Sequence, residues 1–258
     1  MDTGLKDKVV LVTGAGGGIG SSVARAFAAE GARVIVHYRS SRERAEEVAR
    51  EIDGVALQAD LTNEAEVDRL FEESVSALGS IDVLVANAGN WPSTDEAVWA
   101  MSLERWRATI AANLDSVFLS CRAFLRHVQR TKTGNIVIVG STAGLFGEAG
   151  HSDYAAAKGA IASGLLKSLK NEITRIAPLG RVNVVCPGWT ATDMTRDFVR
   201  DPGFVRRITR TMALDKLGRA DDVARAIVAL ASDEISGHIT GEVITVAGGM
   251  EGRVLREL

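Results

Sequence analysis

Cysteine, proline and tyrosine are all scarce in this chain of 258 residues. Its two cysteines, Cys121 and Cys186, cannot form a disulfide framework, and neither lies in a CxxC or Cys/His metal-ligand spacing. No ligand cluster suggests a metal site, so we expect no metal. Because there are 26 glycines but only 4 prolines, the glycines indicate defined turns rather than a disordered linker.

The sequence also lacks an excess of either charge. Lysine and arginine number 30 and the acidic residues 33, which gives a net charge of −3 and no support for a nucleic-acid partner. No uninterrupted apolar run approaches the roughly 18 residues that a membrane span needs. The first residues do not show the basic-then-apolar pattern of a secretory signal. We therefore expect a cytoplasmic protein that engages neither membrane nor nucleic acid.

Short apolar runs alternate with longer segments of helical periodicity. The runs are continuously apolar, as in strands buried on both faces of a parallel sheet. The predicted strands are Val9–Thr13, Arg33–His37, Val55–Gln58, Val83–Ala86, Asn135–Gly140, Arg181–Cys186 and Val243–Val246.

Six segments between these strands have the apolar spacing of helices, and Asn63 can cap the third of them. Regular strand–helix alternation predicts an α/β fold, a Rossmann-like doubly wound parallel sheet of about seven strands with helices on both faces. We expect one domain over 1–258, with its ligand site at the carboxyl ends of the strands. The predicted helices are Ile19–Glu30, Arg42–Ile52, Glu64–Leu78, Leu103–Arg130, Asp153–Ile176 and Asp221–Ala231.

A glycine-rich loop, Thr13–Gly20, links the first predicted strand to the first helix. Glycines let a backbone approach a pyrophosphate closely, and a helix N-terminus offers free N–H groups to it. The spacing of Gly14, Gly18 and Gly20 is G-x-x-x-G-x-G rather than GxGxxG, and no Gly-Lys-Ser/Thr follows, which excludes a P-loop. The alternative is a glycine turn that binds nothing, but its place between strand and helix favours a dinucleotide.

The residues after the second strand bear on which dinucleotide binds. A ribose 2′-hydroxyl is usually read by a carboxylate at this position, but the chain has Arg39 and Ser40 here and no carboxylate until Glu43. A guanidinium pairs with a 2′-phosphate through charge-assisted hydrogen bonds. The sequence therefore favours NADP(H) over NAD(H); the alternative is that Arg39 is a solvated loop charge.

Tyr154 and Lys158 lie four residues apart on a predicted helix, and so on one face of it. A phenol with its ordinary pKa of about 10 is a poor acid or base at neutral pH, and a nearby ammonium lowers that pKa. We expect Lys158 to do this for Tyr154. The pattern alone is weak, since a surface helix pair has the same spacing.

Ser141 follows directly after the fifth predicted strand, where its hydroxyl can hydrogen-bond a substrate carbonyl oxygen. Taken alone, Ser141 is better explained as a turn serine. An acyl-nucleophile role is disfavoured, because there is no GxSxG elbow and no histidine in a triad setting. His151 either lines the pocket or has a capping or surface role.

Together these elements resemble the short-chain dehydrogenase/reductase family over nearly the whole chain. Single motifs are weak, but this set in this order is specific. The resemblance rests on Thr13–Gly20, Asp60, Ala86–Gly89 (with Ala86 in place of an asparagine), Asn113, Ser141, Tyr154, Lys158, Pro187–Gly188 and Thr192, followed by Leu217–Arg219, Ile239–Gly241 and Gly248–Gly249.

The resemblance implies hydride transfer between a nicotinamide and a carbonyl or alcohol carbon. Tyr154 would donate the proton and Ser141 would polarise the carbonyl oxygen. Lys158 would hold the nicotinamide ribose, and Asn113 would hold a water in the proton relay. The family's second basic residue in the glycine loop is missing, since Gly17 stands in that region. The residues assigned to the cofactor are Gly14, Gly18, Ile19, Gly20, Arg39, Ser40, Asp60, Leu61, Asn87, Ala88, Gly89, Tyr154, Lys158, Pro187, Gly188, Thr190 and Thr192.

Substrate and assembly are expected by resemblance as well. Residues 189–215 would cover the substrate, and Pro187–Thr195 is similar to 3-oxoacyl-[acyl-carrier-protein] reductases, which favours an acyl thioester. The segment Asn90–Met101, with Trp91 and Trp99, does not fit that group. The alternatives are a sugar, steroid or small-alcohol dehydrogenase, or a dinucleotide sensor without turnover. Family members imply a homotetramer built partly from the two long helices.

Overall fold

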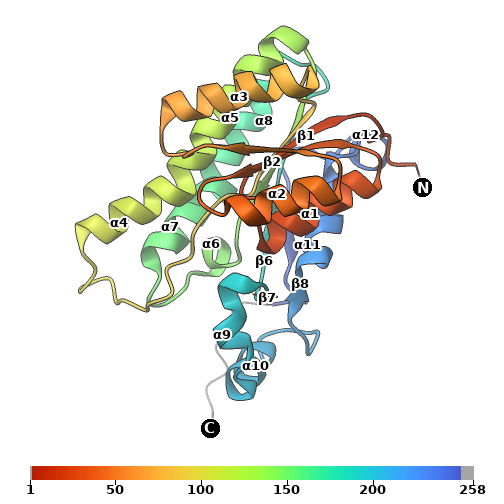
Figure 1. Cartoon of the computed structure of the whole chain (residues 1–258). Coiled ribbons are helices and arrows are strands. Elements are labelled where there is room, and N and C mark those ends of the chain that lie inside the picture. Colours follow the sequence, from red (N-terminus) through yellow and green to blue (C-terminus); the bar gives the residue numbers. More distant parts are fainter. Residues whose placement is uncertain (1, 251–258) are drawn as a thin grey trace.

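The structure, a computed structural model, describes residues 2–250. Its centre is a seven-stranded sheet in the order β3-β2-β1-β4-β5-β6-β9, and every neighbouring pair is parallel (Figure 1). The predicted doubly wound α/β fold is confirmed, with each strand within one residue of its expected bounds. The strands are β1 (Val9–Val12), β2 (Arg33–Tyr38), β3 (Val55–Gln58), β4 (Val83–Ala86), β5 (Asn135–Val139), β6 (Arg181–Pro187) and β9 (Val243–Val246).

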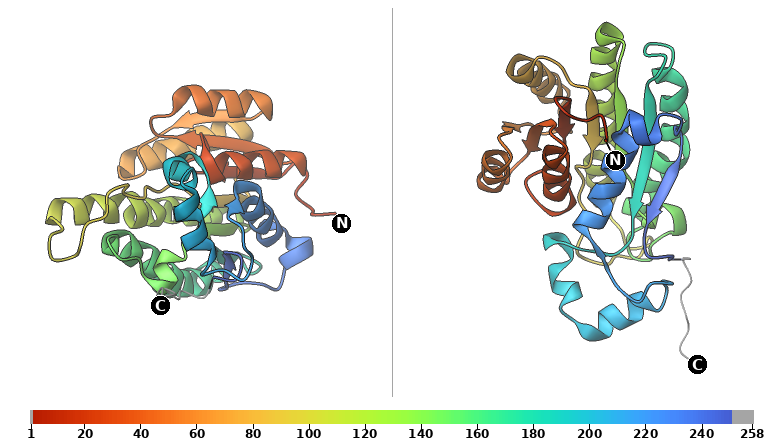
Figure 2. Two further views of the ribbon diagram at one scale, coloured as in Figure 1. Left: turned by 90° about the horizontal axis from the view of Figure 1, so that it is seen from below. Right: turned by 90° about the vertical axis from the view of Figure 1, so that its right-hand side faces the viewer.

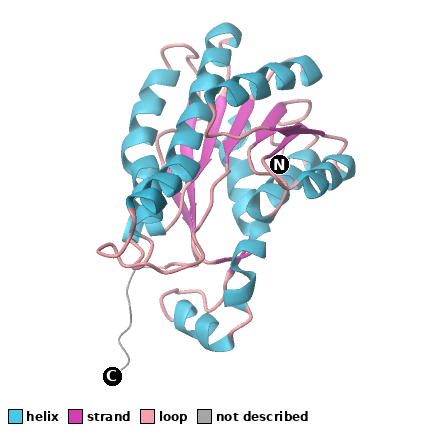
Figure 3. Cartoon of the chain, turned by 60° about the vertical axis from the view of Figure 1, so that its left-hand side comes forward, coloured by secondary structure: helices cyan, strands magenta, loops and turns pink. Residues whose placement is uncertain are grey.

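Continuous apolar strands bury both of their faces here. In β1, Leu11 belongs to one hydrophobic cluster, while Val10 and Val12 belong to the other, on the opposite side of the sheet. Helices α3, α5 and α8 cover the first cluster, and α1, α2 and α11 cover the second (Figures 1 and 3). Their bounds are α1 (Gly18–Ala29), α2 (Arg42–Glu51), α3 (Glu64–Leu78), α5 (Ser116–Thr131), α8 (Leu166–Ile173) and α11 (Ala220–Ala231).

The helix N-termini show why the expected bounds were close. Asn63 caps α3 as predicted, because its Oδ1 accepts hydrogen bonds from the backbone N–H groups of Ala65 and Glu66 at 3.0 and 3.3 Å.

Two predicted long helices each contain a π-helical turn. The first runs through α4 (Leu103–Ile110), η1 (Ala111–Asp115) and α5, and the second through α7 (Ser152–Ala160), η2 (Ile161–Leu165) and α8. Such turns are frequent at functional sites.

The helical stretch Leu103–Thr131 is long and apolar enough, by length and composition, to cross a membrane. In this fold it is a core helix. Phe124 and Val128 are fully buried against the sheet cluster, and Arg122 on the outer side pairs with Glu64 of α3. The sequence analysis looked only for uninterrupted apolar runs long enough to span a membrane. It therefore did not single out this helix, in which polar residues interrupt the apolar ones.

Several short elements were not predicted. The helices α9 and α10 project beyond the carboxyl end of the sheet and lie next to the short strands β7 and β8 (Figure 2). They belong to the 189–215 segment expected to cover the substrate. The short elements are α6 (Ala143–Phe146), β7 (Thr190–Ala191), η3 (Asp193–Thr195), α9 (Arg196–Val199), α10 (Pro202–Thr209), β8 (Gly218–Arg219) and α12 (Asp233–Ser236).

The order of the strands reverses at β1, which lies between β2 and β4. In doubly wound sheets, ligands bind at the carboxyl ends of the strands beside such a switch point. The loops after β1, β4, β5 and β6 are therefore the place to look for a site.

Candidate active site

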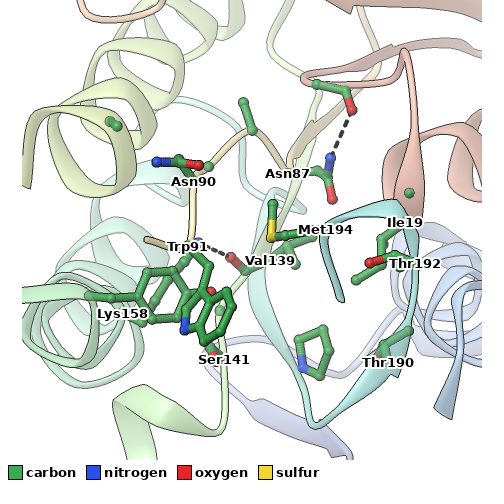
Figure 4. Close-up of a pocket in the computed structure, with 18 of the residues that line it drawn as sticks. Ile19, Asn87, Asn90, Trp91, Val139, Ser141, Lys158, Thr190, Thr192 and Met194 are labelled. Atoms are coloured by element: carbon green, nitrogen blue, oxygen red, sulfur yellow. Dashed lines mark hydrogen bonds between the residues drawn. The ribbon is translucent and has the colours of Figure 1, made fainter. Parts of the chain in front are cut away.

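A single cleft of about 670 Å³ runs along the carboxyl ends of the strands. We call the part lined by residues 14, 16–19, 37–41, 44 and 60–62 the glycine end, and the part lined by residues 91, 141, 148, 154, 158 and 189 the tyrosine end. In the close-up, Trp91, Ser141 and Lys158 lie on one side, and Ile19, Thr190 and Thr192 lie on the other (Figure 4). The cleft thus joins residues from the whole length of the chain.

At the glycine end, the loop after β1 needs glycine at two positions. Gly14 and Gly18 have φ of +66° and +55°, a region that other residues rarely adopt. Both line the cleft. Gly20 lies behind the loop instead, where a Cβ would overlap the carbonyl oxygen of Gly14 and come within 2.6 Å of Asn87 Nδ2. Gly20 therefore lets α1 approach the loop closely.

His37 fastens the loop to the neighbouring strand. Its Nδ1 accepts a hydrogen bond from the backbone N–H of Gly14 at 3.0 Å, so Nε2 carries the proton and donates to the carbonyl oxygen of Ala59, also at 3.0 Å. Burial lowers the pKa of His37 to about 4. The imidazole is therefore neutral at physiological pH, and no sequence motif indicated this role.

Thr13 and Asn87 join the ends of β1 and β4. Thr13 Oγ1 accepts hydrogen bonds from the backbone N–H groups of Asn87 and Ala88, at 2.9 and 3.0 Å. The Asn87 side chain donates to the carbonyl oxygen of Thr13 at 2.9 Å. These bonds fix the floor of the cleft between its two ends, and Asn87, Ala88 and Gly89 line it as predicted.

Arg39, Ser40, Asp60 and Leu61 line the far part of the glycine end, also as predicted. Asp60 Oδ1 accepts hydrogen bonds from the backbone and hydroxyl of Thr62, at 2.9 and 2.7 Å. These bonds hold the pKa of the Asp60 carboxyl below its ordinary value. The cleft here is also lined by Gly16, Gly17, Ser41 and Arg44, which the sequence analysis did not assign.

At the tyrosine end, Ser141, Tyr154 and Lys158 come together as predicted. Lys158 Nζ lies 5.8 Å from the centroid of the Tyr154 ring and donates a hydrogen bond to the carbonyl oxygen of Val139 at 2.9 Å. The four-residue spacing on α7 therefore does place phenol and ammonium at one site.

The electrostatics of this pair differ from the expectation. Burial raises the pKa of Tyr154 to about 12, against a hydrogen bond with Ser141 that lowers it, and the Glu148 charge raises it further. Burial also lowers the pKa of the fully enclosed Lys158 ammonium to about 8. In the protein without a coenzyme the pKa of Tyr154 is therefore raised and not lowered as expected, because burial disfavours the phenolate.

Asn113 lies within the π-helical turn η1 and is fully buried behind the cleft wall. Its Nδ2 donates to the carbonyl oxygens of Asn90 and Thr109, at 2.8 and 3.0 Å, and its Oδ1 accepts from the backbone N–H of Asn90 at 3.0 Å. A Cβ at Gly89 would lie 2.7 Å from that Oδ1 and 3.4 Å from Lys158 Nζ. Asn113 is therefore a neighbour of Lys158, separated from the cleft by Gly89.

A buried ion pair supports the start of α7. Asp153 is fully buried and accepts hydrogen bonds from Arg105 Nε at 3.1 Å, from Thr109 Oγ1 at 2.8 Å and from the backbone N–H of Tyr154 at 2.9 Å. Arg105 also pairs with Glu96 at 2.9 Å. This network ties α4 to α7 directly beside Tyr154.

Aromatic side chains form one wall of the tyrosine end. Trp91 stacks on His151 with 4.6 Å between ring centroids, and it meets Trp189 and Phe198 edge-on at 5.8 and 5.3 Å. Phe204 of α10 packs against Trp189 at 4.9 Å. Trp91, Trp189 and Met194 line the cleft, whereas His151 lies behind Trp91.

Trp91 also reaches a carboxylate. Its side chain hydrogen-bonds Glu148, whose pKa is raised by burial against the pull of His151. The loop that carries Trp91 is held in place, because His151 Nε2 donates to the carbonyl oxygen of Pro92 at 2.7 Å and the N–H of Glu96 donates to that of Gly150 at 2.9 Å. The sequence analysis named Trp91 and His151 separately but missed Glu148.

Within residues 2–250 there is no group of three or more histidine, cysteine, aspartate or glutamate side chains that could hold a metal ion. Cys121 and Cys186 are both free and buried.

Comparison with known proteins identifies the family of this chain. A family model described as "Enoyl-(Acyl carrier protein) reductase" matches residues 14–251. A 3-oxoacyl-[acyl-carrier-protein] reductase of Synechocystis is 38% identical, covering 96% of this chain and 98% of the relative. The enzymes of that name from Escherichia coli and Staphylococcus aureus are 37% and 38% identical, covering 94% of this chain and 97% and 98% of the relatives. The chain therefore belongs to the short-chain dehydrogenase/reductase family and is an oxidoreductase that uses NAD(P)(H).

Proposed function

We propose that this protein is an NADP(H)-dependent carbonyl reductase whose favoured substrate is a 3-oxoacyl thioester on an acyl carrier protein. The observation that carries this proposal is the continuous cleft, with a glycine-rich loop at one end and the serine, tyrosine and lysine set at the other. The relatives' names support the substrate class.

The cleft fits a dinucleotide. A Cβ at Gly14 would come within 3.0 Å of Ala88 Cα, so glycine lets this loop lie directly against the loop after β4, and both loops line the part of the cleft where a pyrophosphate would bind. The N–H groups at the start of α1 would bind it. Asp60 and Leu61 would hold the adenine, and Pro187, Gly188, Thr190 and Thr192 the nicotinamide side. When bound, the coenzyme supplies the hydride.

The residues at the tyrosine end would supply the proton to the carbonyl oxygen. With a pKa of about 12, Tyr154 is a neutral phenol at pH 7 and can donate to a carbonyl oxygen as negative charge develops there. Ser141 would hydrogen-bond the same oxygen. Lys158, still largely protonated with a pKa of about 8, would hold the ribose and stabilise the phenolate that remains. Asn113, behind Gly89, would position a water next to Lys158.

The NADP(H) preference rests on the residues after β2. No carboxylate from this segment lines the cleft, whereas Arg39 and Ser40 do. A guanidinium here binds a 2′-phosphate and gains little from a 2′-hydroxyl.

The tyrosine end also favours a second substrate class, a sugar or other small hydroxyl-bearing alcohol or ketone. Glu148 lines the cleft beside Tyr154, and a carboxylate accepts hydrogen bonds from hydroxyl groups. An acyl chain has no such donor. The segment 189–215 would cover either substrate.

We also infer a homotetramer in the cytoplasm. Phe118 and Leu125 of α5 and Leu169 and Ile176 at α8 line a shallow groove, with Phe118 well exposed. A second copy of this chain would cover these apolar side chains.

The test is NADPH oxidation, followed at 340 nm, with 3-oxoacyl thioesters, keto-sugars, steroids and simple ketones. The proposal expects the highest kcat/KM with the thioester. Highest kcat/KM with a keto-sugar would favour the second class. Tight NADPH binding without turnover of any substrate would indicate a sensor and contradict the proposal.

A further inference from the structure

A second arginine, Arg44, lines the glycine end of the cleft together with Arg39. It lies in the first turn of α2, five residues beyond Arg39. The glycine loop itself has no basic side chain, since position 17 is glycine. Yet Arg44 Nη1 lies only 3.7 Å from the point where a Cβ of Gly17 would stand. A guanidinium from α2 therefore lies directly beside the loop position that has no side chain.

The packing of α2 on the loop explains this placement. A Cβ at Gly16 would lie 3.3 Å from the carbonyl oxygen of Ser41 and 3.5 Å from the Ala45 side chain, so the start of α2 touches the loop backbone. Because Ala45 is fully buried in that contact, the orientation of the first helical turn is fixed. Arg44 is the residue next to it and extends along Gly17.

Arg39 reaches the same region from the end of β2. Its charge contributes to lowering the pKa of Asp60, which lines this end of the cleft. Ser40 and Ser41, which lie between the two arginines in the sequence, also line the cleft. Two cations and two hydroxyls thus lie at one end of the cleft together with Asp60, whose carboxylate accepts hydrogen bonds from Thr62.

We propose that Arg44 is a specificity-determining residue for the coenzyme, a second cation for the 2′-phosphate that takes the place of a basic side chain in the glycine loop. This inference rests on the proposed NADP(H)-dependent function. A phosphate dianion accepts hydrogen bonds from two guanidinium groups at once, whereas a 2′-hydroxyl gains little from a second cation. Arg44 would therefore add to the affinity for NADP(H) and leave that for NAD(H) nearly unchanged.

The chain offers a matched control in Arg42. It is exposed in the same turn of α2, but it pairs with Glu46 at 2.7 Å and does not line the cleft. Substituting it removes one positive charge from α2 without removing a guanidinium from the cleft.

The experiment measures dissociation constants by calorimetry for 2′,5′-ADP and for 5′-AMP, which differ only in the 2′-phosphate and require no turnover. The proteins are the wild type and the Arg39→Ala, Arg42→Ala, Arg44→Ala and Arg44→Lys variants. We expect Arg44→Ala to weaken 2′,5′-ADP binding roughly tenfold and 5′-AMP binding hardly at all. Arg44→Lys should retain part of the affinity, and Arg42→Ala should match the wild type.

The outcomes separate this inference from the proposed function. If the wild type and Arg39→Ala differ in 2′,5′-ADP affinity but Arg44→Ala binds like the wild type, the role of Arg44 is rejected while the NADP(H) preference stands. Equal losses for 5′-AMP and 2′,5′-ADP in Arg44→Ala would also reject it, since they would indicate a damaged loop. A wild type that binds both nucleotides equally would overturn the NADP(H) preference and this inference with it.

Discussion

The two ends of the cleft are built in different ways. The glycine end consists of strand ends and backbone, fastened by bonds such as those from Gly14 to His37 and from Asn87 to Thr13. The wall of the tyrosine end consists largely of side chains from loops and short helices outside the sheet. There Trp91, His151 and Glu148 hold one another, and Trp91 also meets Trp189.

This difference separates the part of the cleft whose shape the sheet determines from the part whose shape depends on side-chain packing. A strand end in a parallel sheet has its position set by the ladder on either side, so the glycine end keeps its shape whatever the substrate is. The wall residues have no such support and depend on mutual packing. Changes at the glycine end should therefore alter coenzyme binding or stability, whereas changes in the wall should alter the choice of substrate.

The largest effect is expected from Tyr154→Phe, which removes the proton donor and little else. We expect kcat to fall by about 10³-fold, because a positioned acid contributes roughly 10²–10⁴-fold. The dissociation constant for NADPH should change by less than about twofold, since coenzyme affinity resides mainly at the other end. Stopped-flow kinetics and fluorescence titration measure the two. A parallel loss of NADPH affinity would show that the ends are not separable.

A pH effect should follow from His37 at the glycine end. Its folded-state pKa of about 4 lies below the ordinary 6.5, so the unfolded chain binds the proton first and stability is lost as pH falls through this window. The loss should total about 3 kcal/mol between pH 6.5 and pH 4. Urea unfolding across this range measures it. His37→Leu should flatten the profile while His238→Ala, at an exposed histidine, should not; an unchanged slope in His37→Leu would contradict the account.

A smaller loss of stability is expected at the tyrosine end from Asp153→Asn. Breaking a buried ion pair typically costs about 3–5 kcal/mol, and because Arg105 retains Glu96 we expect about 2 kcal/mol. Asp68→Asn, in an exposed pair with Arg126, should cost under about 1 kcal/mol. If the two variants unfold at the same urea concentration, the buried network does not support α7.

The smallest effect is expected from Trp91→Ala in the wall. Loss of its aromatic contacts should raise KM for the best substrate about tenfold, with NADPH affinity unchanged. Trp99→Ala, at an exposed tryptophan on the same segment, is the control. A changed ranking of substrates in Trp91→Ala would support the view that the wall of the tyrosine end determines substrate choice. An unchanged KM would show that Trp91 does not contribute to substrate binding.

Sequence patterns predicted the regular fold well because each buried strand is a continuous apolar run. The π-helical turn at Asn113 could not be predicted, since it inserts a residue into a helix without changing the apolar pattern. Helices α9 and α10 were missed as well. They lie beyond the sheet, where packing against Trp189 decides their place.

For the site, motifs identified residues whose position follows from a strand end or one helical turn, such as Ser141, Tyr154 and Lys158. They missed residues that act through distant partners: His37 through Gly14, Glu148 through Trp91, and Arg44 through Gly17. The pKa of Tyr154 in the protein alone lies above its ordinary value and not below it as expected, because spacing shows an adjacent charge but not the burial that disfavours the phenolate.

The central claim is direct hydride transfer in this cleft with Tyr154 as proton donor. The most direct measurement is a single turnover with NADPH that carries deuterium at the transferable ring position, using the best carbonyl substrate from the panel and mass spectrometry of the product. The account predicts deuterium on the former carbonyl carbon with the wild type and almost no product with Tyr154→Phe in the same time. An unlabelled alcohol, or labelled product formed equally fast by Tyr154→Phe, would contradict it.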